Sequence, residues 1–248
     1  MTRHKIKNAM IFAAGLGTRM QPLTLETPKP LAQILNKPLL EYKIDYFKKY
    51  GIEKIVINCF HLGEQIEEYI SKRNDDSIIV VKEENLLDTG GGLVNALNYL
   101  GDQPIFVTNS DTIHVDKDIS ALESLENSWN NPSYKDEDSN MDMLMLLADK
   151  ESAIGYNGKG DFNISDHNKL QWQQEKQEYI YTGLMILDTN VLNSYKNIDK
   201  FSLREIWIDN TSKNNGIINN SFGVIFNGMW LHIDSVEGIK KAELALKR

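Results

Sequence analysis

The chain has 248 residues, of which 41% are hydrophobic and 25% are charged, and its formal net charge is −8. This is enough apolar material for one large core, and no long linker divides the chain, so we expect one domain. The acidic balance argues against partners that need clustered Lys and Arg, namely nucleic acid and anionic lipid surfaces.

The first half of the chain alternates short apolar runs with helical patterns. Runs rich in Ile and Val, bounded by turn residues, predict strands at 9–15, 54–60, 77–83 and 104–111. Apolar residues at spacings of three and four predict helices at 38–51, 62–73 and 91–101. This alternation predicts an α/β fold with right-handed crossovers and a mostly parallel sheet covered by helices on both faces.

The second half is less regular. We expect a short helix at 116–126, a solvated loop at 127–140 and a terminal helix at 235–248. Further strands are predicted at 141–149, 162–166, 169–173, 179–188, 222–227 and 229–234. Nothing in this half indicates an internal repeat or a second core.

Two features bear on the compartment. The one cysteine, Cys59, excludes an internal disulfide and is expected to be buried in a strand, which favours a reducing environment. The apolar run that follows the basic N-terminus is too short for a secretory signal or a membrane span. We therefore expect a cytoplasmic protein that binds no membrane.

A glycine-rich stretch, FAAGLGTRMQPLTLETPKP, follows the first predicted strand. A dinucleotide fingerprint would need a third glycine where Met20 stands, and no acidic residue ends the second strand to bind a ribose hydroxyl. A Walker A loop would need Lys after its last glycine, but Thr18 and Arg19 follow Gly17. Both of these phosphate-binding motifs are excluded.

What remains is a loop in which glycines admit phosphate close to the backbone. Gly15 and Gly17 can expose N–H groups, and Arg19 and Lys29 can reach a triphosphate from two directions. The alternative is an ordinary glycine turn with two surface cations.

Polar residues also follow a second strand. Asp111 ends the predicted strand 104–111, so it points to the edge where a hard oxygen ligand for Mg²⁺ belongs; the alternative is a capping or turn aspartate. Asn109 lies two residues earlier on the same face.

Two other glycine positions are candidates for close contact with a ligand. The turn Thr89, Gly90, Gly91 at a helix N-terminus suits a base or a ribose, unless it is only a helix entry. Gly183, inside a strand, indicates close approach of a ligand.

The glycine stretch also carries a family resemblance. GLGTRMQPLTLETPKPL, at 15–31, resembles the signature of sugar-1-phosphate nucleotidylyltransferases, with G-x-G-T-R, P-L-T and P-K-P-L in order. Further matches follow at 36–42, 57–66, 86–97, 107–111, 158–162, 181–187 and 229–237, so the resemblance covers essentially the whole chain. The segments DTGGG and GKGDF are most similar to those of N-acetylmuramate α-1-phosphate uridylyltransferases.

The resemblance implies a fold and a reaction. The fold is a three-layer, Rossmann-like nucleotide-diphospho-sugar transferase fold with a mixed, mostly parallel sheet, forming a single nucleotidyltransferase domain over 1–248. In the reaction, a sugar 1-phosphate attacks the α-phosphorus of a nucleoside triphosphate in line, and pyrophosphate leaves. Such chemistry needs positioning, charge neutralisation and Mg²⁺, or Mn²⁺ in its place, rather than a nucleophilic side chain.

The resemblance also implies roles for individual residues. Arg19 would hold the leaving pyrophosphate, Lys29 would stabilise charge at the α-phosphate, and Asp111 would bind the metal. The other nucleotide-binding residues would be Ala13, Ala14, Gly15, Gly17, Thr18, Thr89, Gly90 and Gly91. The sugar phosphate would contact Asn109, Gly160, Asp161 and Gly183.

One segment departs from the family pattern. Relatives usually place a second metal-binding aspartate two residues after the tryptophan of W-x-D-x-G-T. After Trp230 that position is His232, and Asp234 takes the glycine position. His232 could bind the metal or orient a bound group, Asp234 could substitute from a shifted position, or Asp111 could act without either.

The resemblance predicts uridylyl transfer from UTP to N-acetylmuramic acid 1-phosphate for cell-wall recycling. Guanylyl transfer to mannose or heptose 1-phosphate, and uridylyl or thymidylyl transfer to glucose 1-phosphate, are the nearby alternatives. A non-catalytic nucleotide-sugar sensor is the alternative from another class. We expect small-molecule substrates as partners, no nucleic acid, and a monomer or small homo-oligomer.

Overall fold

The computed structural model describes residues 5–134, 141–172, 176–209 and 217–247. Its strands are β1 Asn8–Phe12, β2 Gln33–Ile34, β3 Lys37–Pro38, β4 Lys54–Cys59, β5 Ile78–Lys82, β6 Ile105–Asn109, β7 Thr112–Asp116, β8 Met143–Asp149, β9 Ala153–Ile154, β10 Asn163–Ile164, β11 Lys169–Gln171, β12 Tyr179–Leu187, β13 Ile217–Ile225 and β14 Gly228–His232. Its α-helices are α1 Leu39–Tyr50, α2 Gly63–Ser71, α3 Asp88–Leu100, α4 Ala121–Trp129, α5 Leu203–Asp209 and α6 Val236–Leu246.

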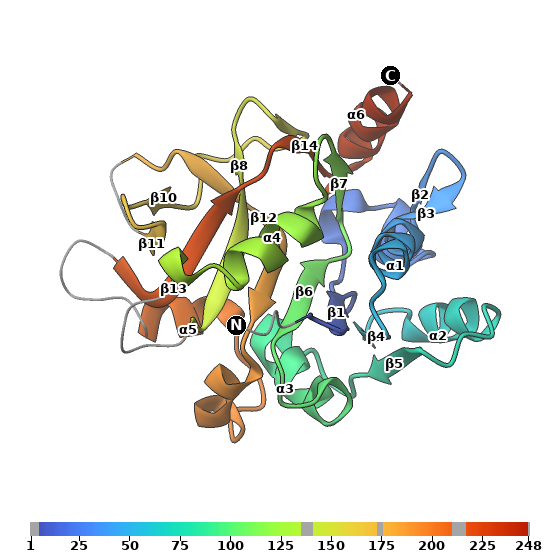
Figure 1. The fold of residues 1–248 in the computed structure, drawn as a ribbon. Coiled ribbons are helices and arrows are strands. Elements are labelled where there is room, and N and C mark those ends of the chain that lie inside the picture. Colours follow the sequence, from blue (N-terminus) through green and yellow to red (C-terminus); the bar gives the residue numbers. More distant parts are fainter. Residues whose placement is uncertain (1–4, 135–140, 173–175, 210–216, 248) are drawn as a thin grey trace.

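One large mixed sheet organises the molecule (Figure 1). Among the described residues its strand order is β10-β11-β13-β8-β12-β6-β1-β4-β5. Parallel pairs join β6, β1, β4 and β5, and another joins β13 to β8; the remaining pairs are antiparallel. Because β1, β4 and β6 run parallel, their carboxyl ends open on the same edge, where ligands bind in open α/β sheets. The predicted α/β class is confirmed.

Helices cover both faces of this sheet. Successive side chains of a strand point to opposite faces, and in β1 Ile11 packs in one core cluster while Met10 packs in the other. The first cluster includes buried residues of α1, α2 and α4. The second includes buried residues of α3 and α5. The continuous apolar pattern of β1 and β4 therefore reflects burial on both sides.

A smaller core lies beside the main sheet. Strands β7, β14 and β9 form a three-stranded sheet, and α6 packs near β14 and β2 (Figure 1). Ile34, Leu39, Ile113, Leu231 and Ala242 belong to its buried cluster. This unit holds the end of β14 next to the carboxyl end of β6, because Ile233 N–H donates to the Asp111 carbonyl at 2.9 Å.

Most predicted elements of the first half are confirmed, but the segment after Asp111 differs. Residues 112–116 form β7, and α4 begins only at Ala121, where the Ser120 hydroxyl accepts from Glu123 N–H. The loop predicted at 127–140 is wrong for 127–129, which complete α4 because Leu122, Leu125 and Trp129 continue its buried face. Positions 135–140, and the ends of the predictions 169–173 and 235–248, lie outside the described residues. The sequence did not predict four short elements, because they span too few residues to show a hydrophobic period: β2, β3, β9 and α5.

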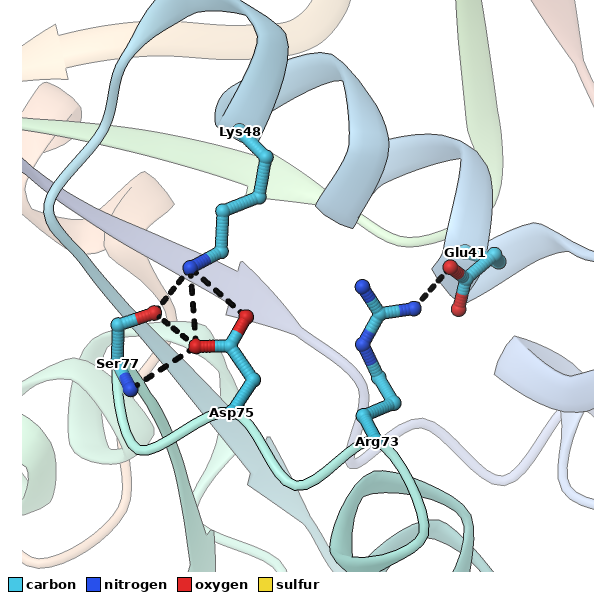
Figure 2. Close-up of polar contacts among 5 residues, drawn as sticks. All are labelled: Glu41, Lys48, Arg73, Asp75 and Ser77. Carbon is cyan, nitrogen blue, oxygen red and sulfur yellow. Dashed lines mark hydrogen bonds and ion pairs between the residues drawn. The ribbon is translucent and has the colours of Figure 1, made fainter.

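Ion pairs connect α1 to the end of α2 and to the turn that follows it (Figure 2). Lys48 of α1 contacts Asp75 and Ser77 in the turn before β5, with its Nζ 2.9 Å from Asp75 Oδ2. Arg73, just after α2, donates to Glu41 of α1. These contacts hold α1 and α2 in place on one face of β4 and β5.

Candidate active site

A cavity of about 370 Å³ opens at the carboxyl ends of β1 and β6. The glycine loop forms one side of it, and both polar and apolar residues of other strands and turns form the rest. The predicted site residues among those lining it are Ala14, Gly15, Gly17, Thr18, Arg19, Lys29, Thr89, Asn109, Asp111 and Asp234. The fold therefore brings the glycine loop, the end of β6 and the end of β14 to one place.

Local contacts hold the glycine loop in shape. After Gly17 the chain makes three short 3₁₀ turns, at Thr18–Met20, Leu23–Leu25 and Lys29–Leu31. Gly17 has a φ of 63°, and an added Cβ would lie 2.9 Å from the Thr24 methyl carbon. The Thr24 hydroxyl donates to the Gly17 carbonyl at 2.8 Å. Gly17 is thus needed for both its conformation and its lack of a side chain.

The first part of the loop leaves donors open to a ligand. Within the described chain, the N–H groups of Ala14 to Gly17 have no hydrogen-bond acceptor. An added Cβ at Gly15 would meet open space. Successive free N–H groups of this kind form an anion-binding concavity. Ala13 differs, because its N–H donates to Asn58 Oδ1 at 2.9 Å and Ala13 does not line the cavity.

The two cations of the loop each contact a carboxylate. Lys29 Nζ lies 2.6 Å from Asp111 Oδ2, and both side chains are largely buried. Arg19 Nη1 lies 2.6 Å from Asp234 Oδ2, with the Arg19 side chain exposed. Burial opposes ionisation of Asp111, but Lys29, His232 and Lys43 together hold the pKa of its carboxyl below the ordinary value.

The donors near Asp111 suit a hard cation. Asp111 Oδ1 is buried and has no hydrogen-bond partner, so this carboxylate retains one free ligand position. His232 Nδ1 is also buried without a partner, and the imidazole stacks on Trp230 with ring centroids 5.3 Å apart. Burial lowers the pKa of His232, although Asp111 and Asp234 act to raise it. Asp234 lines the cavity, whereas His232 does not.

A metal ion would nevertheless need ligands besides the protein. Among residues 5–134, 141–172, 176–209 and 217–247, no group of three or more His, Cys, Asp or Glu is placed to hold one. Phosphate oxygens commonly complete such a site around Mg²⁺.

Gly183 has a packing role in the structure. Its φ is 74°, and an added Cβ would lie 2.8 Å from Nδ2 of Asn109. The register of β12 against β8 shifts between Tyr181 and Met185, where this glycine lies. The structure thus gives Gly183 a packing role, because it leaves room for the Asn109 side chain that lines the cavity; the predicted contact with a ligand stays a prediction.

The glycines after Thr89 are buried rather than open to a ligand. The N–H groups of Gly90 and Gly91 both donate to the Phe201 carbonyl, at 2.9 and 3.1 Å. An added Cβ at Gly90 would lie 2.3 Å from the Phe201 ring, and one at Gly91 would lie 2.3 Å from the Asp199 carbonyl oxygen. These glycines allow α3 to pack against the segment before α5, while Thr89 and Asp88 reach the cavity.

The two residues predicted to bind sugar lie outside this cavity, on the segment before β10. Gly160 has a φ of 101°, and an added Cβ would lie 2.6 Å from the Gln177 carbonyl oxygen. Asp161 Oδ2 accepts from Tyr181 N–H at 2.9 Å, and burial raises the pKa of its carboxyl. Asp161 retains a second carboxylate oxygen for other donors.

Sequence reasoning missed several residues that line the cavity, including Asn58, Leu86, Asp88 and Ser110. Asn58 carried a signal, because it is the one polar residue inside the apolar stretch IVINCF. Asp88 is the first residue of the matched segment DTGGG, but its φ of 63°, unusual for a residue other than glycine, is visible only in the structure.

The described helices include none that is long and apolar enough to cross a membrane.

Comparison with known proteins identifies a family that the chain matches. A family model described as "Nucleotidyl transferase" matches residues 8–156. N-acetylmuramate alpha-1-phosphate uridylyltransferase of Caulobacter vibrioides is 28% identical over 247 residues, covering 97% of each chain. D-glycero-alpha-D-manno-heptose 1-phosphate guanylyltransferase of Campylobacter jejuni is 28% identical over 214 residues, covering 83% of this chain and 86% of the relative. The crystal structure of HddC from Yersinia pseudotuberculosis complexed with GMP-PN has a TM-score of 0.73 at 22% identity, covering 97% of this chain and 100% of the other.

Proposed function

The chain belongs to the nucleotidyl transferase family, and we propose that it transfers a nucleotidyl group from a nucleoside triphosphate to a sugar 1-phosphate. The proposed substrates are UTP and N-acetylmuramic acid 1-phosphate, and the products are UDP-N-acetylmuramate and pyrophosphate. One observation carries the proposal: Arg19 and Lys29, each paired with a carboxylate, line the same cavity as the open N–H groups of the glycine loop.

The proposed reaction needs no nucleophilic side chain. A phosphate oxygen of the sugar 1-phosphate attacks the α-phosphorus, and the bond from that phosphorus to the bridging oxygen breaks as pyrophosphate leaves. The N–H groups of 14–17 would bind phosphate oxygens. Arg19 would neutralise the leaving pyrophosphate, and Lys29 would neutralise charge developing at the α-phosphate. Asp161 would accept hydrogen bonds from sugar hydroxyls.

A divalent cation is part of the proposal. Asp111 would bind Mg²⁺ through its unpartnered Oδ1, with Asp234 or His232 as the second protein ligand. Asp234 is an oxygen donor that lines the cavity, which favours it for Mg²⁺, whereas an imidazole ligand would favour Mn²⁺. When bound, such an ion neutralises phosphate charge and orients the reacting groups.

The choice of uracil and of N-acetylmuramate rests on similarity alone. The uridylyltransferase relative matches essentially end to end, and the guanylyltransferase relative has the same identity over a somewhat shorter alignment. Guanylyl transfer to a heptose 1-phosphate is therefore the second candidate. A cytoplasmic location and a role in cell-wall recycling belong to the first.

A substrate panel tests the proposal. The purified protein is incubated with each of UTP, GTP, CTP, dTTP and ATP, paired with the 1-phosphates of N-acetylmuramate, glucose, mannose and heptose, and Mg²⁺-dependent pyrophosphate release is measured. Turnover restricted to UTP with N-acetylmuramate 1-phosphate is expected. A strong preference for GTP would favour the second candidate, and nucleotide-sugar binding without pyrophosphate release from any pair would indicate a sensor.

A further inference from the structure

The cavity has two walls that come from distant parts of the chain. One wall begins where β1 ends, at Phe12 and Ala14, and the other is formed by Leu86, in the turn before α3, and by Thr89, in the first turn of α3. The side chain of Asn58, at the end of β4, lies between them and is only 2% exposed. Its amide group is placed to form hydrogen bonds to both walls.

A continuous chain of hydrogen bonds joins the two walls through Asn58. Ala13 N–H donates to Asn58 Oδ1 at 2.9 Å, and Asn58 Nδ2 donates to Glu83 Oε1 at 2.7 Å. Glu83 Oε2 then accepts from Leu87 N–H at 3.0 Å. Glu83 is 2% exposed and does not line the cavity. Both of its oxygens are therefore occupied by protein donors.

The direction of these hydrogen bonds is determined by their two ends. Both ends are backbone N–H groups, so the side chains between them must present an acceptor to Ala13 and an acceptor to Leu87. The pair of one amide and one carboxylate meets this requirement, with a single donor between them. Two amides would lack an acceptor, and two carboxylates would lack the donor.

The contact between Asn58 and Glu83 also requires glycine at the third glycine position of the DTGGG segment. An added Cβ at Gly92 would lie 2.7 Å from Asn58 Nδ2 and 2.7 Å from Glu83 Oε1. The N-terminal turn of α3 can approach the hydrogen-bonded pair only because this residue has no side chain.

We propose that Asn58 and Glu83 are positioning residues that fix the phosphate-binding end of β1 relative to Leu87–Thr89 at the start of α3, so that the nucleotide cavity is formed before substrate binds. The inference rests on the proposed function. It assigns neither residue a covalent or proton-transfer role, because their polar atoms are engaged with each other and with the backbone. Preformed geometry matters because small displacements of reacting groups are costly in rate.

An exchange of the two chemical groups tests the proposal. Asn58→Asp places two carboxylates against each other, and Glu83→Gln leaves either Asn58 or Leu87 facing a donor. The double variant Asn58→Asp/Glu83→Gln restores an acceptor at both ends and one donor between them, with the polarity reversed. Glu84→Gln, at the neighbouring exposed position, is the control for loss of one negative charge.

Three measurements are made at a temperature where every variant is folded: amide hydrogen exchange at Ala13 and Leu87 without ligand, the Kd of the nucleoside triphosphate, and kcat and KM for each substrate. Each single variant should lose protection at both amides and lose up to about 100-fold in kcat/KM for the nucleotide. The KM of the sugar 1-phosphate should change little. The double variant should recover protection and most of the activity, and Glu84→Gln should match wild type.

The proposal is overturned if the double variant shows no recovery beyond the singles, or if the singles lose thermal stability while nucleotide Kd and kcat are unchanged. The second result would mean that the pair stabilises the fold without positioning the site. Failure of the proposed function itself would be seen separately, as absence of nucleotide binding and turnover in the wild-type protein.

Discussion

The ammonium group of Lys29 lies 2.6 Å from Oδ2 of Asp111, where the glycine loop meets the carboxyl end of β6. Arg19 and Asp234 repeat the arrangement at the end of β14. Each cation expected to bind phosphate is thus paired with a carboxylate. Nucleotide binding would exchange one anion for another at these cations, and it would free the two carboxylates to bind the divalent ion. We expect nucleotide and metal to bind cooperatively for this reason.

Replacement of Arg19 should separate catalysis from stability. Arg19→Ala removes a cation aimed at the pyrophosphate, so we expect kcat to fall by roughly 10²–10³-fold. Its ion pair with Asp234 is mostly exposed on the arginine side, so the free energy of unfolding should change by less than about 1 kcal/mol. Pyrophosphate release and urea unfolding measure the two effects. Lys37→Ala, which breaks a surface pair with Asp45 away from the cavity, is the control. Near-normal kcat in Arg19→Ala would contradict its role.

Replacement of Lys29 should lower both kcat and the free energy of unfolding. Lys29→Met should lower kcat to a similar extent, and it leaves the buried Asp111 carboxylate without its partner, at a cost of about 1–3 kcal/mol in unfolding free energy. The pKa of Asp111 should rise, since Lys29 is the largest influence lowering it. Lys29→Met/Asp111→Asn should recover stability but not activity. Stability of this double variant below that of Lys29→Met would show that the pair is not the source of the loss.

The part of the site predicted from the sequence is the part that depends on order along the chain. Gly17, Arg19 and Lys29 lie in one contiguous motif, and Asp111 closely follows a strand that the sequence predicts, so the sequence pattern was enough to place them at one edge of the sheet. The packing roles of Gly90 and Gly183 could not be read from the sequence, because the residues they pack against, Phe201 and Asn109, are distant in sequence. The same limit applies to the fold: β4 was readable from its apolar run, whereas β7 becomes a strand through pairing with β14.

The second metal ligand can be identified without measuring activity. We expect Asp111→Asn to abolish Mn²⁺ binding in the presence of a nucleoside triphosphate, as measured by electron paramagnetic resonance. Asp234→Asn should weaken it strongly, because that carboxylate lines the cavity, and His232→Gln should weaken it less. Loss of Mn²⁺ binding in His232→Gln with normal binding in Asp234→Asn would reverse the assignment.

The ion pair between Lys48 and Asp75 should make stability sensitive to acid. Contacts with Ser77 and Lys48 lower the pKa of Asp75 to about 2. Its contribution is therefore complete above the ordinary aspartate pKa and is lost as pH falls towards 2. Because both side chains are partly exposed, the contribution should not exceed about 1 kcal/mol. Urea unfolding should show Asp75→Asn less stable than wild type at pH 7, with the difference shrinking below pH 4. A difference that persists unchanged to pH 2 would contradict the assignment.

Lys43 should make the free energy of unfolding increase as the pH rises above neutral. Its ammonium is buried, donates to the Thr112 hydroxyl at 2.8 Å and lies 3.3 Å from His114 Nδ1. Burial lowers the pKa of Lys43 to about 7, although Asp111 acts to raise it. Burial, and then Lys43, also hold the pKa of His114 well below its ordinary value, so the imidazole is neutral across this range.

The sign of the effect follows from where the proton is bound. Between about pH 7 and 10 the unfolded lysine carries a proton that the folded lysine has released, so unfolding takes up protons and stability rises with pH. The slope for one group cannot exceed about 1.4 kcal/mol per pH unit. A small cavity beside Lys43 is also lined by Asp45, Tyr46 and Lys49, which titrate on their own account. The quantity to measure is therefore the difference in unfolding free energy between wild type and Lys43→Met. We expect wild type to gain stability relative to Lys43→Met from pH 7 to pH 9.5 in urea unfolding, whereas parallel pH profiles would show that Lys43 remains charged in the fold.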